Sequence, residues 1–258
     1  MKELFNSQGQ KIDQSRLEFL SNQGAEYNVY RYQDQVIKLF KDKHKLHHLT
    51  VPIINHLKTI PTQRILLPTA AILDQDGHLV GYQMPLVVGE KDLQNERMGH
   101  IFNEMQVLQA DLDLLNQARV ILYDVNAANT IYNGHINLID PGNYDVNNID
   151  TIKEQIDPFN LCPDEKAALQ KWNDKKINRL FDELLFLNNP QLDWYQRRTI
   201  VQFFGQTKEV KQTNSNLAIY QEYLNPNLSV QAATQQLLHQ HIKEDPQERE
   251  LLSRMINR

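Results

Sequence analysis

The sequence predicts an α+β fold with two lobes, a small β-rich N-terminal lobe and a larger helical C-terminal lobe. Runs of β-branched and aromatic residues, separated by turn residues, crowd the first third of the chain and are typical of short strands. After Gly89 the apolar residues recur at intervals of three and four, the period of an amphipathic helix. The two patterns meet near Gly89, so we expect an N-terminal lobe of residues 1–88 and a C-terminal lobe of residues 89–258.

Two pairs of strands are predicted in the N-terminal lobe. They cover residues 27–32 with 35–40, and residues 69–73 with 78–88. Gln33 and Asp34 form a short turn in the first pair, and Asp76-Gly77 is a strong hairpin signal in the second. Each pair is therefore expected to be antiparallel.

One helix is predicted between the two strand pairs, over residues 43–58, where the leucines and isoleucines have helical spacing. Pro52 lies inside this segment. It either kinks the helix or begins its second half as a first-turn proline. The N-terminal lobe is thus expected to be a small sheet with one helix.

The C-terminal lobe is predicted to begin with a long helix over residues 98–116, which carries one apolar stripe. A strand–loop–strand segment follows over residues 120–140. The remaining helices are expected at residues 164–188, 193–204, 216–223 and 230–242, followed by a polar helix at the C-terminus.

Composition and charge exclude several classes of protein. Hydrophobic residues make up 41% and charged residues 23% of the 258 residues, as in an ordinary globular protein. The formal net charge of −5 argues against a nucleic-acid partner. The single cysteine, Cys162, forms no intramolecular disulfide. The first residues have no apolar core, and no run of about 20 apolar residues is present, so we expect a cytoplasmic protein with no membrane partner.

Three oxygen-bearing side chains follow one another in the strand–loop–strand segment. Asp124 and Asn129 bracket a polar loop, and Asp140 comes directly after the apolar run 136–139. Asn133-Gly134 supplies a hairpin turn, which brings Asp140 back toward Asn129. Carboxylate and amide oxygens are ligands that suit Mg²⁺. Each of the three is also a common turn residue, and only their joint spacing favours a site.

This spacing resembles that of the protein-kinase-like superfamily. Its catalytic loop has an Asp, four residues and an Asn, and a hairpin later an Asp-Phe-Gly. Here Asn129 stands five residues after Asp124, and Asp140 begins an Asp-Pro-Gly eleven residues after Asn129. Upstream, residues 24–30 resemble the second half of the glycine-rich loop, and Lys38 stands on the strand that carries the phosphate-binding lysine. The resemblance covers roughly residues 20–142 and implies an atypical, minimal kinase of bacterial style.

The resemblance implies a role for each matching residue. ATP and Mg²⁺ would be the cofactors, with Asn129 and Asp140 as metal ligands, and Asp124 would accept the proton of the acceptor hydroxyl. Lys38 would contact the phosphates, although a lysine on an edge strand is a common device against sheet pairing. The other residues expected around the nucleotide are Gly24 and Ala25 in the loop, Val36 beside the lysine, and Met84 as gatekeeper.

One element of the family pattern is missing, because residues 39–89 contain no glutamate to pair with Lys38. Asn55 and His56 stand where that partner is expected, and neither is an anion at neutral pH. Lys38 should therefore have a substitute anion, with Glu26 the nearest candidate, or lack firm order until ATP supplies the charge.

Three functions remain open from the sequence. The first is ATP- and Mg²⁺-dependent phosphoryl transfer to a hydroxyl group on a protein or a small molecule. The second is a pseudokinase, a nucleotide-responsive module that acts through a protein partner. The third is transfer of AMP on a kinase fold with the same metal ligands.

Overall fold

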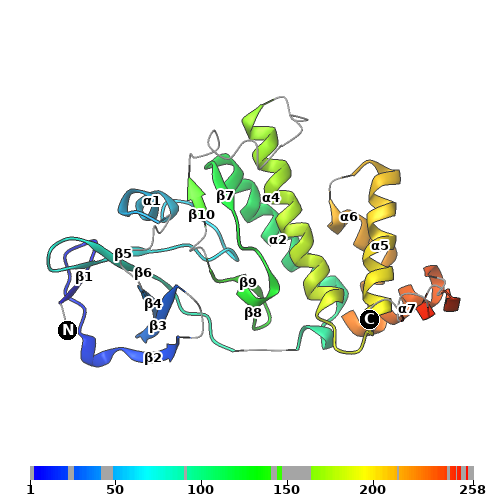
Figure 1. The fold of residues 1–258 in the computed structure, drawn as a ribbon, viewed down its shortest axis with the longest axis horizontal. Helices are drawn as coiled ribbons and strands as arrows, with labels where there is room; N and C mark the ends of the chain where they lie inside the picture. Colours follow the sequence, from blue (N-terminus) through cyan, green and yellow to red (C-terminus); the bar gives the residue numbers. More distant parts are fainter. Residues whose placement is uncertain are drawn as a thin grey trace. The chain divides into compact units, whose positions relative to one another are not determined.

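The computed structural model divides the chain into two compact units (Figure 1). It describes residues 3–22, 26–41, 49–89, 92–140, 144–146, 164–213, 215–242, 245–247, 249–250 and 254. The first unit comprises residues 1–90, 108–125 and 129–173, and the second comprises residues 91–107, 126–128 and 174–258. The predicted lobes, residues 1–88 and 89–258, are a different partition and stay a prediction. The α+β class is confirmed.

The largest sheet of the described chain, six-stranded and antiparallel, lies in the first unit. Its strands are β1 (Leu4–Asn6), β2 (Glu18–Ser21), β3 (Tyr27–Tyr32), β4 (Gln35–Phe40), β5 (Ala70–Asp74) and β6 (Leu79–Pro85). Their order across the sheet is β1-β5-β6-β4-β3-β2. Both predicted hairpins are confirmed, since β3 pairs with β4 and β5 with β6. The two edge strands, β1 and β2, were not predicted.

One face of this sheet packs a hydrophobic cluster. Its buried members are Leu4, Ile12, Ile37, Ile72 and Val80. Neighbouring residues along a strand point to opposite faces, so Ile37 places the residues on either side of it, Val36 and Lys38, on the other face.

The helix of the first unit, α1 (Val51–Leu57), is shorter than predicted. Thr50 caps it by accepting a hydrogen bond from the N–H of Ile53, and Pro52 lies in its first turn. The first-turn alternative for Pro52 is therefore confirmed. Residues 43–48 of the predicted helix lie outside the described residues.

Two small antiparallel sheets complete the strands of the first unit. In one, β7 (Val120–Leu122) pairs with β10 (Tyr144–Val146). In the other, β8 (Thr130–Tyr132) pairs with β9 (Ile136–Leu138). Gly134 lies in the turn of this second pair with a φ of 101°, a backbone conformation that favours glycine.

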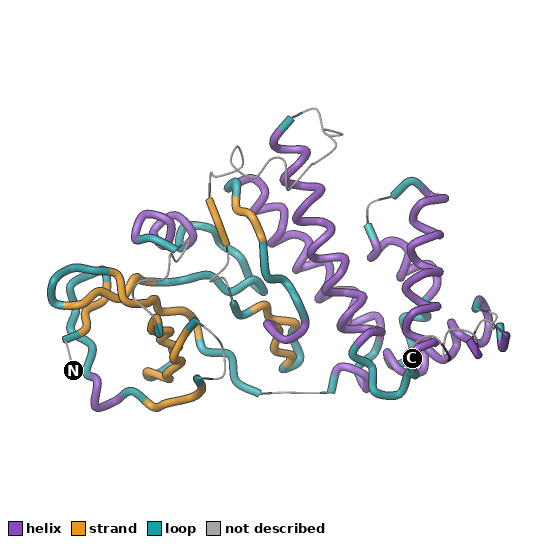
Figure 2. Tube along the Cα trace, in the orientation of Figure 1, coloured by secondary structure: helices purple, strands orange, loops and turns teal. Residues whose placement is uncertain are grey.

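Helices dominate the described chain after residue 164 (Figure 2). Besides α1, the α-helices are α2 (Met98–Gln117), earlier in the chain, and then α4 (Glu165–Asp182), α5 (Trp194–Lys211), α6 (Asn216–Tyr223) and α7 (Val230–His241). The single-turn elements are η1 (Gln14–Arg16), η2 (Leu93–Asn95), η3 (Ala127–Asn129) and the π-helical η5 (Glu183–Leu187). The predicted helices between residues 98 and 242 are confirmed in place, and α5 extends seven residues beyond its predicted end. The polar helix predicted at the C-terminus lies largely outside the described residues. In the described part of the chain, no helix has the length and apolar character needed to cross a membrane.

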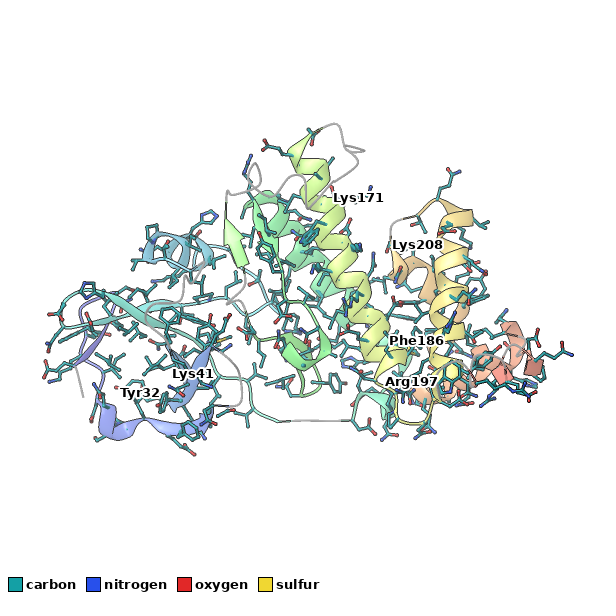
Figure 3. All side chains as sticks on the ribbon, viewed as in Figure 1. Tyr32, Lys41, Lys171, Phe186, Arg197 and Lys208 are labelled. Atoms are coloured by element: carbon teal, nitrogen blue, oxygen red, sulfur yellow. The ribbon has the colours of Figure 1, made fainter. Side chains whose placement is uncertain are left out.

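Aromatic side chains form the core of the second unit. Phe186, which Figure 3 labels, stacks on Phe204 with ring centroids 5.4 Å apart. Tyr220 is edge-to-face with both rings, with its ring centroid 4.8 Å from that of Phe204 and 5.7 Å from that of Phe186. Such edge-to-face and stacked pairs stabilise a core beyond the area they bury.

A buried polar cluster lies beside this aromatic core. The hydroxyl of Tyr220 donates to the carboxylate of Asp182, and Nδ2 of Asn216 lies 3.4 Å from both carboxylate oxygens. Lys208, labelled in Figure 3, donates to Oδ1 of Asn216 at 3.2 Å. Burial raises the pKa of Asp182 to about 6, because the charged carboxylate loses its hydration, while the Tyr220 hydrogen bond partly opposes this.

Candidate functional site

The face of the sheet opposite the hydrophobic cluster presents Lys38. This residue lies in the middle of β4, directly opposite Tyr82 on β6, and Val36 lies opposite Met84 in the same register. Since side chains opposite each other on neighbouring strands share a face, Lys38, Tyr82, Val36 and Met84 project to the same side. All four are buried. The predicted nucleotide-binding residues of β4 and β6 therefore lie together on one face.

A glycine on β6 allows the two strands to approach closely at this point. A Cβ on Gly81 would lie 2.2 Å from the carbonyl oxygen of Lys38, far inside van der Waals contact. No other residue fits without moving β4 away from β6. The sequence therefore needs glycine here to keep Lys38 in register.

The ammonium group of Lys38 forms an ion pair with Asp140. Its Nζ lies 2.9 Å from Oδ1 of Asp140 and 3.3 Å from the carbonyl oxygen of Ile139. The Lys38 side chain is 8% exposed and that of Asp140 is 25% exposed, so water screens the pair only in part. The predicted phosphate-binding lysine and the predicted metal ligand, 102 positions apart in the sequence, are thus in direct contact.

Two tyrosine rings surround this ion pair. The Lys38 Nζ lies 5.5 Å from the ring centre of Tyr27 and 5.8 Å from that of Tyr82, within the range of a cation–π contact. The hydroxyl of Tyr82 makes a weak 3.5 Å contact with Oδ1 of Asp140. Burial raises the pKa of Tyr27, and the negative charges of Glu26 and Asp140 raise it further. The Tyr27 phenol therefore keeps its proton at neutral pH.

The sequence suggested Glu26 as the nearest anion for Lys38, and the structure shows a different partner. Within the described residues, the carboxylate at ion-pair distance from Lys38 is that of Asp140, not that of Glu26. Asn55 is exposed, and Nε2 of His56 lies 3.1 Å from the carbonyl oxygen of Ala118, so neither stands in for the glutamate. The substitute anion comes from the second predicted metal position.

The catalytic-loop residues predicted from spacing also meet. Nδ2 of Asn129 donates at 3.0 Å both to the backbone oxygen and to the carboxylate Oδ2 of Asp124. Both partners are acceptors, which fixes the orientation of the Asn129 amide. Oδ1 of Asn129, the amide atom suited to a metal, therefore faces away from these two contacts.

The β8–β9 hairpin connects the two pairs. Thr130 lies opposite Leu138 in its register, and the next position along continues the ladder, where the N–H of Ile139 donates to the carbonyl oxygen of Asn129 at 2.9 Å. Hydrogen bonds therefore connect Lys38 to the backbone of Ile139, Ile139 to Asn129, and Asn129 to Asp124. Asp140 joins this path through its ion pair with Lys38.

A buried carboxylate that was not predicted supports this hairpin. Asp111 on α2 is 2% exposed, and its carboxylate accepts the backbone N–H groups of residues 63–65 at 2.6 to 2.9 Å. That loop pairs with β9, since the N–H of Leu138 donates to the carbonyl oxygen of Arg64 at 2.8 Å. Asp111 thus positions the strand that ends two residues before Asp140. Asp111 could have been noticed in the sequence, because it is an acidic residue between Leu108 and Leu115 on the apolar stripe of α2.

The strand before Asp124 is held by two side chains of α4. Oδ1 of Asn173 accepts the N–H of Leu122 at 3.0 Å, and Nδ2 of Asn173 donates to the carbonyl oxygen of Val120 at 2.9 Å. Nε1 of Trp172 donates to the carbonyl oxygen of Leu122 at 2.7 Å. These bonds fix β7 two residues before the predicted catalytic aspartate.

Some predicted positions lie outside the described residues. These are Gly24 and Ala25 of the glycine-rich loop, and Pro141 and Gly142 of the Asp-Pro-Gly motif.

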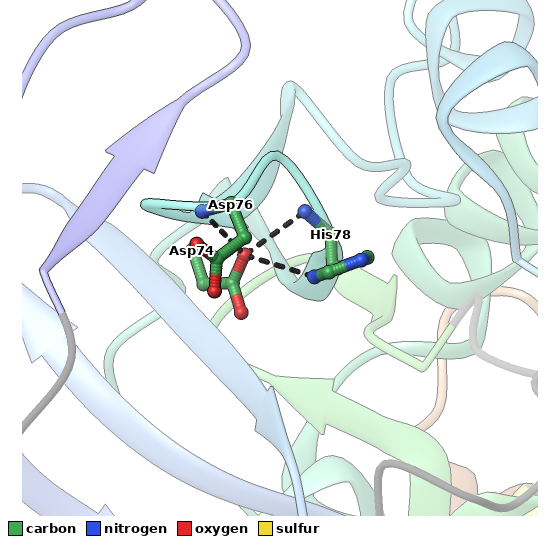
Figure 4. A group of neighbouring side chains, drawn as sticks. All are labelled: Asp74, Asp76 and His78. Atoms are coloured by element: carbon green, nitrogen blue, oxygen red, sulfur yellow. Dashed lines mark hydrogen bonds and ion pairs between the residues drawn. The ribbon is translucent and has the colours of Figure 1, made fainter.

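The β5–β6 turn brings together a different group of metal-ligating side chains (Figure 4). Asp74 is buried, and its Oδ1 accepts the N–H groups of Asp76 at 3.0 Å and of His78 at 2.9 Å. Nδ1 of His78 lies 3.4 Å from the same oxygen. This is the hydrogen-bonding pattern by which an aspartate closes a turn, and it accounts for the arrangement.

In comparisons with known proteins, no protein-family model matches the chain, and no curated protein matches its sequence.

Proposed function

We propose that this protein binds ATP with Mg²⁺ and transfers a phosphoryl group to a hydroxyl acceptor. The observation that carries the proposal is that Lys38, the ion-pair partner of Asp140, is connected by hydrogen bonds through the backbone of Ile139 to Asn129 and from there to the carboxylate of Asp124. The residues that a kinase-like site would use come from separate segments of the first unit. The finer fold assignment, a kinase-like fold with lobes 1–88 and 89–258, belongs to the same proposal.

The residues suit the two cofactors. Phosphoryl transfer asks a protein mainly for positioning and for neutralisation of charge. Lys38 offers a cation for phosphate oxygens, and Asp140 with Oδ1 of Asn129 offers hard oxygen ligands for Mg²⁺. Val36 lies two residues from Lys38, about 7 Å along the strand, and with Met84 offers an apolar surface to a purine base.

The ion pair between Lys38 and Asp140 gives each group a partner in the chain without nucleotide. On this proposal, ATP and Mg²⁺ bind together because they replace that pair with two others. Phosphate takes over the ammonium group of Lys38, and the metal ion takes over the carboxylate of Asp140. If the nucleotide binds without the metal ion, Asp140 is left without a cation. The affinity for ATP should therefore be much lower in the absence of Mg²⁺.

Asp124 is the group that acts on the acceptor. Its carboxylate is partly exposed, and Asn129 holds it in one orientation through Oδ2. A carboxylate held in this way can accept the proton of an attacking hydroxyl, a contribution of about 10²–10⁴-fold in rate.

The test measures thermal stabilisation by ATP with Mg²⁺ and with EDTA, followed by analysis of the products. We expect stabilisation that depends on Mg²⁺ and release of ADP. Asp124→Asn should bind ATP normally and lose about 10²–10⁴-fold in turnover, while Asp140→Asn should lose the dependence on Mg²⁺. Asp113→Asn, which removes an exposed carboxylate of α2, is the matched control.

Other results would assign other functions. Incorporation of AMP into an acceptor indicates nucleotidyl transfer, and binding without turnover indicates a pseudokinase that acts through a partner. Equal stabilisation in Mg²⁺ and in EDTA removes the metal assignment. No stabilisation in either condition removes the nucleotide assignment altogether.

A further inference from the structure

Lys38 has two partners besides Asp140, the aromatic rings of Tyr27 and Tyr82. Its Nζ lies 5.5 Å from the centre of the Tyr27 ring and 5.8 Å from that of the Tyr82 ring. Both distances are within the roughly 6 Å at which an ammonium group is attracted to the face of a ring. Tyr27 is 6% exposed and Tyr82 is 0% exposed, so little water weakens the attraction.

The sheet itself holds the two rings in place. Tyr27 lies on β3 and Tyr82 on β6, the strands on either side of β4, which carries Lys38. Tyr82 stands directly opposite Lys38, and Tyr27 stands opposite Phe40, which is on the same face of β4 as Lys38. The Tyr27 ring packs against those of Phe40 and Tyr82, with centroid distances of 5.7 and 5.5 Å. Strand pairing and ring packing therefore position both rings independently of Asp140.

Asp140 reaches Lys38 from a different part of the fold. It follows β9, which belongs to the separate two-stranded sheet of β8 and β9, so the ion pair is no part of the large sheet. On the proposed function, Mg²⁺ takes the carboxylate of Asp140, and the ammonium group of Lys38 then loses this anion. The rings of Tyr27 and Tyr82 offer the metal ion no carboxylate, so they stay with Lys38 when Asp140 is taken.

We propose that Tyr27 and Tyr82 are positioning residues for Lys38, and that their rings take the place of the glutamate absent from residues 39–89. This inference rests on the proposed function, because it concerns the orientation of Lys38 while ATP and Mg²⁺ are bound. The attraction of an ammonium group to a ring face comes from the charge distribution of the ring, not from the hydroxyl group. Phenylalanine should therefore replace either tyrosine in this role, whereas an aliphatic side chain should not.

The first test follows the NMR signals of the Lys38 ε-methylene group in the full-length protein, assigned by their loss in Lys38→Met. Protons over an aromatic ring are shifted upfield, so these signals should lie upfield of those of the exposed Lys58. Asp140→Asn removes the anion and leaves both rings, so the upfield shift should persist. Tyr27→Leu should reduce the shift although the ion pair is intact. The measurement needs no nucleotide, so it separates a failure of this inference from a failure of the proposed function.

The second test measures the affinity for ATP at saturating Mg²⁺ by calorimetric titration. Tyr27→Leu should weaken it about two- to thirtyfold, the range for cation–π contacts at exposed to desolvated sites, and Tyr27→Phe should restore it to within about twofold. In a Lys38→Met background, Tyr27→Leu should cause no further loss. Tyr32, labelled in Figure 3, is the matched control, because it lies on the same strand and packs against the hydrophobic cluster. Tyr32→Leu and Tyr32→Phe should bind ATP equally.

Several results would overturn the inference. Loss of the upfield shift in Asp140→Asn would mean that the carboxylate, and not the rings, holds the lysine. Equal ATP affinities of Tyr27→Leu and Tyr27→Phe would mean that the ring has no part in binding, and a further loss from Tyr27→Leu in Lys38→Met would mean that the ring acts on another group. If the parent protein does not bind ATP with Mg²⁺, the proposed function is wrong, and the NMR measurement in Asp140→Asn alone decides whether the rings position Lys38.

Discussion

Replacement of Lys38 by methionine removes the ammonium group and keeps most of the side-chain volume. It leaves the carboxylate of Asp140 largely buried, with Tyr82 as a weak donor at 3.5 Å. Loss of one member of a fully buried pair costs about 3–5 kcal/mol. Because Asp140 is 25% exposed, water recovers part of this energy, and we expect a loss of about 1–3 kcal/mol in the free energy of unfolding.

A double-mutant cycle isolates the pair from other effects of the substitution. Asp140→Asn alone leaves the buried ammonium of Lys38 without an anion, so it should lower the free energy of unfolding by about as much as Lys38→Met does. The double variant Lys38→Met with Asp140→Asn contains neither charge, and its loss should be about 1–3 kcal/mol smaller than the sum of the single losses. Urea unfolding at constant pH measures all four proteins.

Binding of Mg²⁺ alone tests the functional side of the same pair. On the proposed function, the metal ion must compete in the parent protein with Lys38 for the carboxylate of Asp140. Lys38→Met removes that competitor, so the affinity for Mg²⁺ should rise at least about tenfold while the affinity for ATP falls. Lys58→Met, at an exposed position after α1, should change neither affinity.

Two results would refute this reasoning. A coupling energy below about 0.5 kcal/mol would mean that the ion pair is not formed in solution. A lower Mg²⁺ affinity in Lys38→Met would mean that the lysine assists the metal site and does not compete with it.

Three further predictions concern the supports of the site and the second unit. Asp111→Asn should lower the free energy of unfolding by about 2–3 kcal/mol and speed hydrogen exchange at the amides of residues 63–65, because one amide oxygen cannot accept all of the N–H groups that the carboxylate accepts. Unchanged exchange at these amides would contradict the prediction. Gly81→Ala should lower the free energy of unfolding in urea by about 1–3 kcal/mol, because its Cβ meets a backbone oxygen of β4. Gly205→Ala, which has open space around it in α5, should raise the free energy of unfolding by up to about 1 kcal/mol. Equal effects of the two variants would refute the close approach of β4 and β6. The pKa of Asp182 is near 4 in the unfolded protein and about 6 in the folded protein. Between these pH values the unfolded protein releases the proton more readily, so the free energy of unfolding falls as pH rises, by about 3 kcal/mol in all. Asp182→Asn should lack this decline in urea unfolding from pH 4 to 7, and parallel pH curves for the two proteins would remove the assignment.

Sequence periodicity predicted the elements whose signals are local. The hairpins of β3 with β4 and of β8 with β9 follow from alternating residues around a tight turn, and both lie where predicted. The edge strands β1 and β2 escaped prediction because their pairing depends on distant strands. In β2, Phe19 and Leu20 are adjacent and both exposed, so the segment has no alternation to detect.

The same difference between local and long-range signals applies to the candidate site. The spacing predicted the contact of Asn129 with Asp124 and the return of the chain to Asn129 at Ile139, because a short hairpin leaves the chain little choice about where its second strand lies. The convergence of Asp140 with these two side chains stays a prediction. The contact of Lys38 with Asp140 joins residues 102 positions apart and follows only from the packing of the sheet against that hairpin. The kinase-like resemblance implied a substitute anion for Lys38, since residues 39–89 contain no glutamate.

The use of Asp140 as the partner of Lys38 has a consequence for any mutational study of this protein. In the family pattern, one carboxylate orients the lysine and another binds the metal, so substitutions at the two positions can be interpreted separately. On the proposed function, the single carboxylate of Asp140 would do both here, and α1 carries no acidic residue that could relieve it. Loss of activity in a Lys38 or Asp140 variant therefore cannot by itself distinguish a lost phosphate contact from a lost metal ligand. The opposite signs expected for Mg²⁺ and ATP binding in Lys38→Met do distinguish them, because only a lysine that competes with the metal weakens one ligand while it strengthens the other.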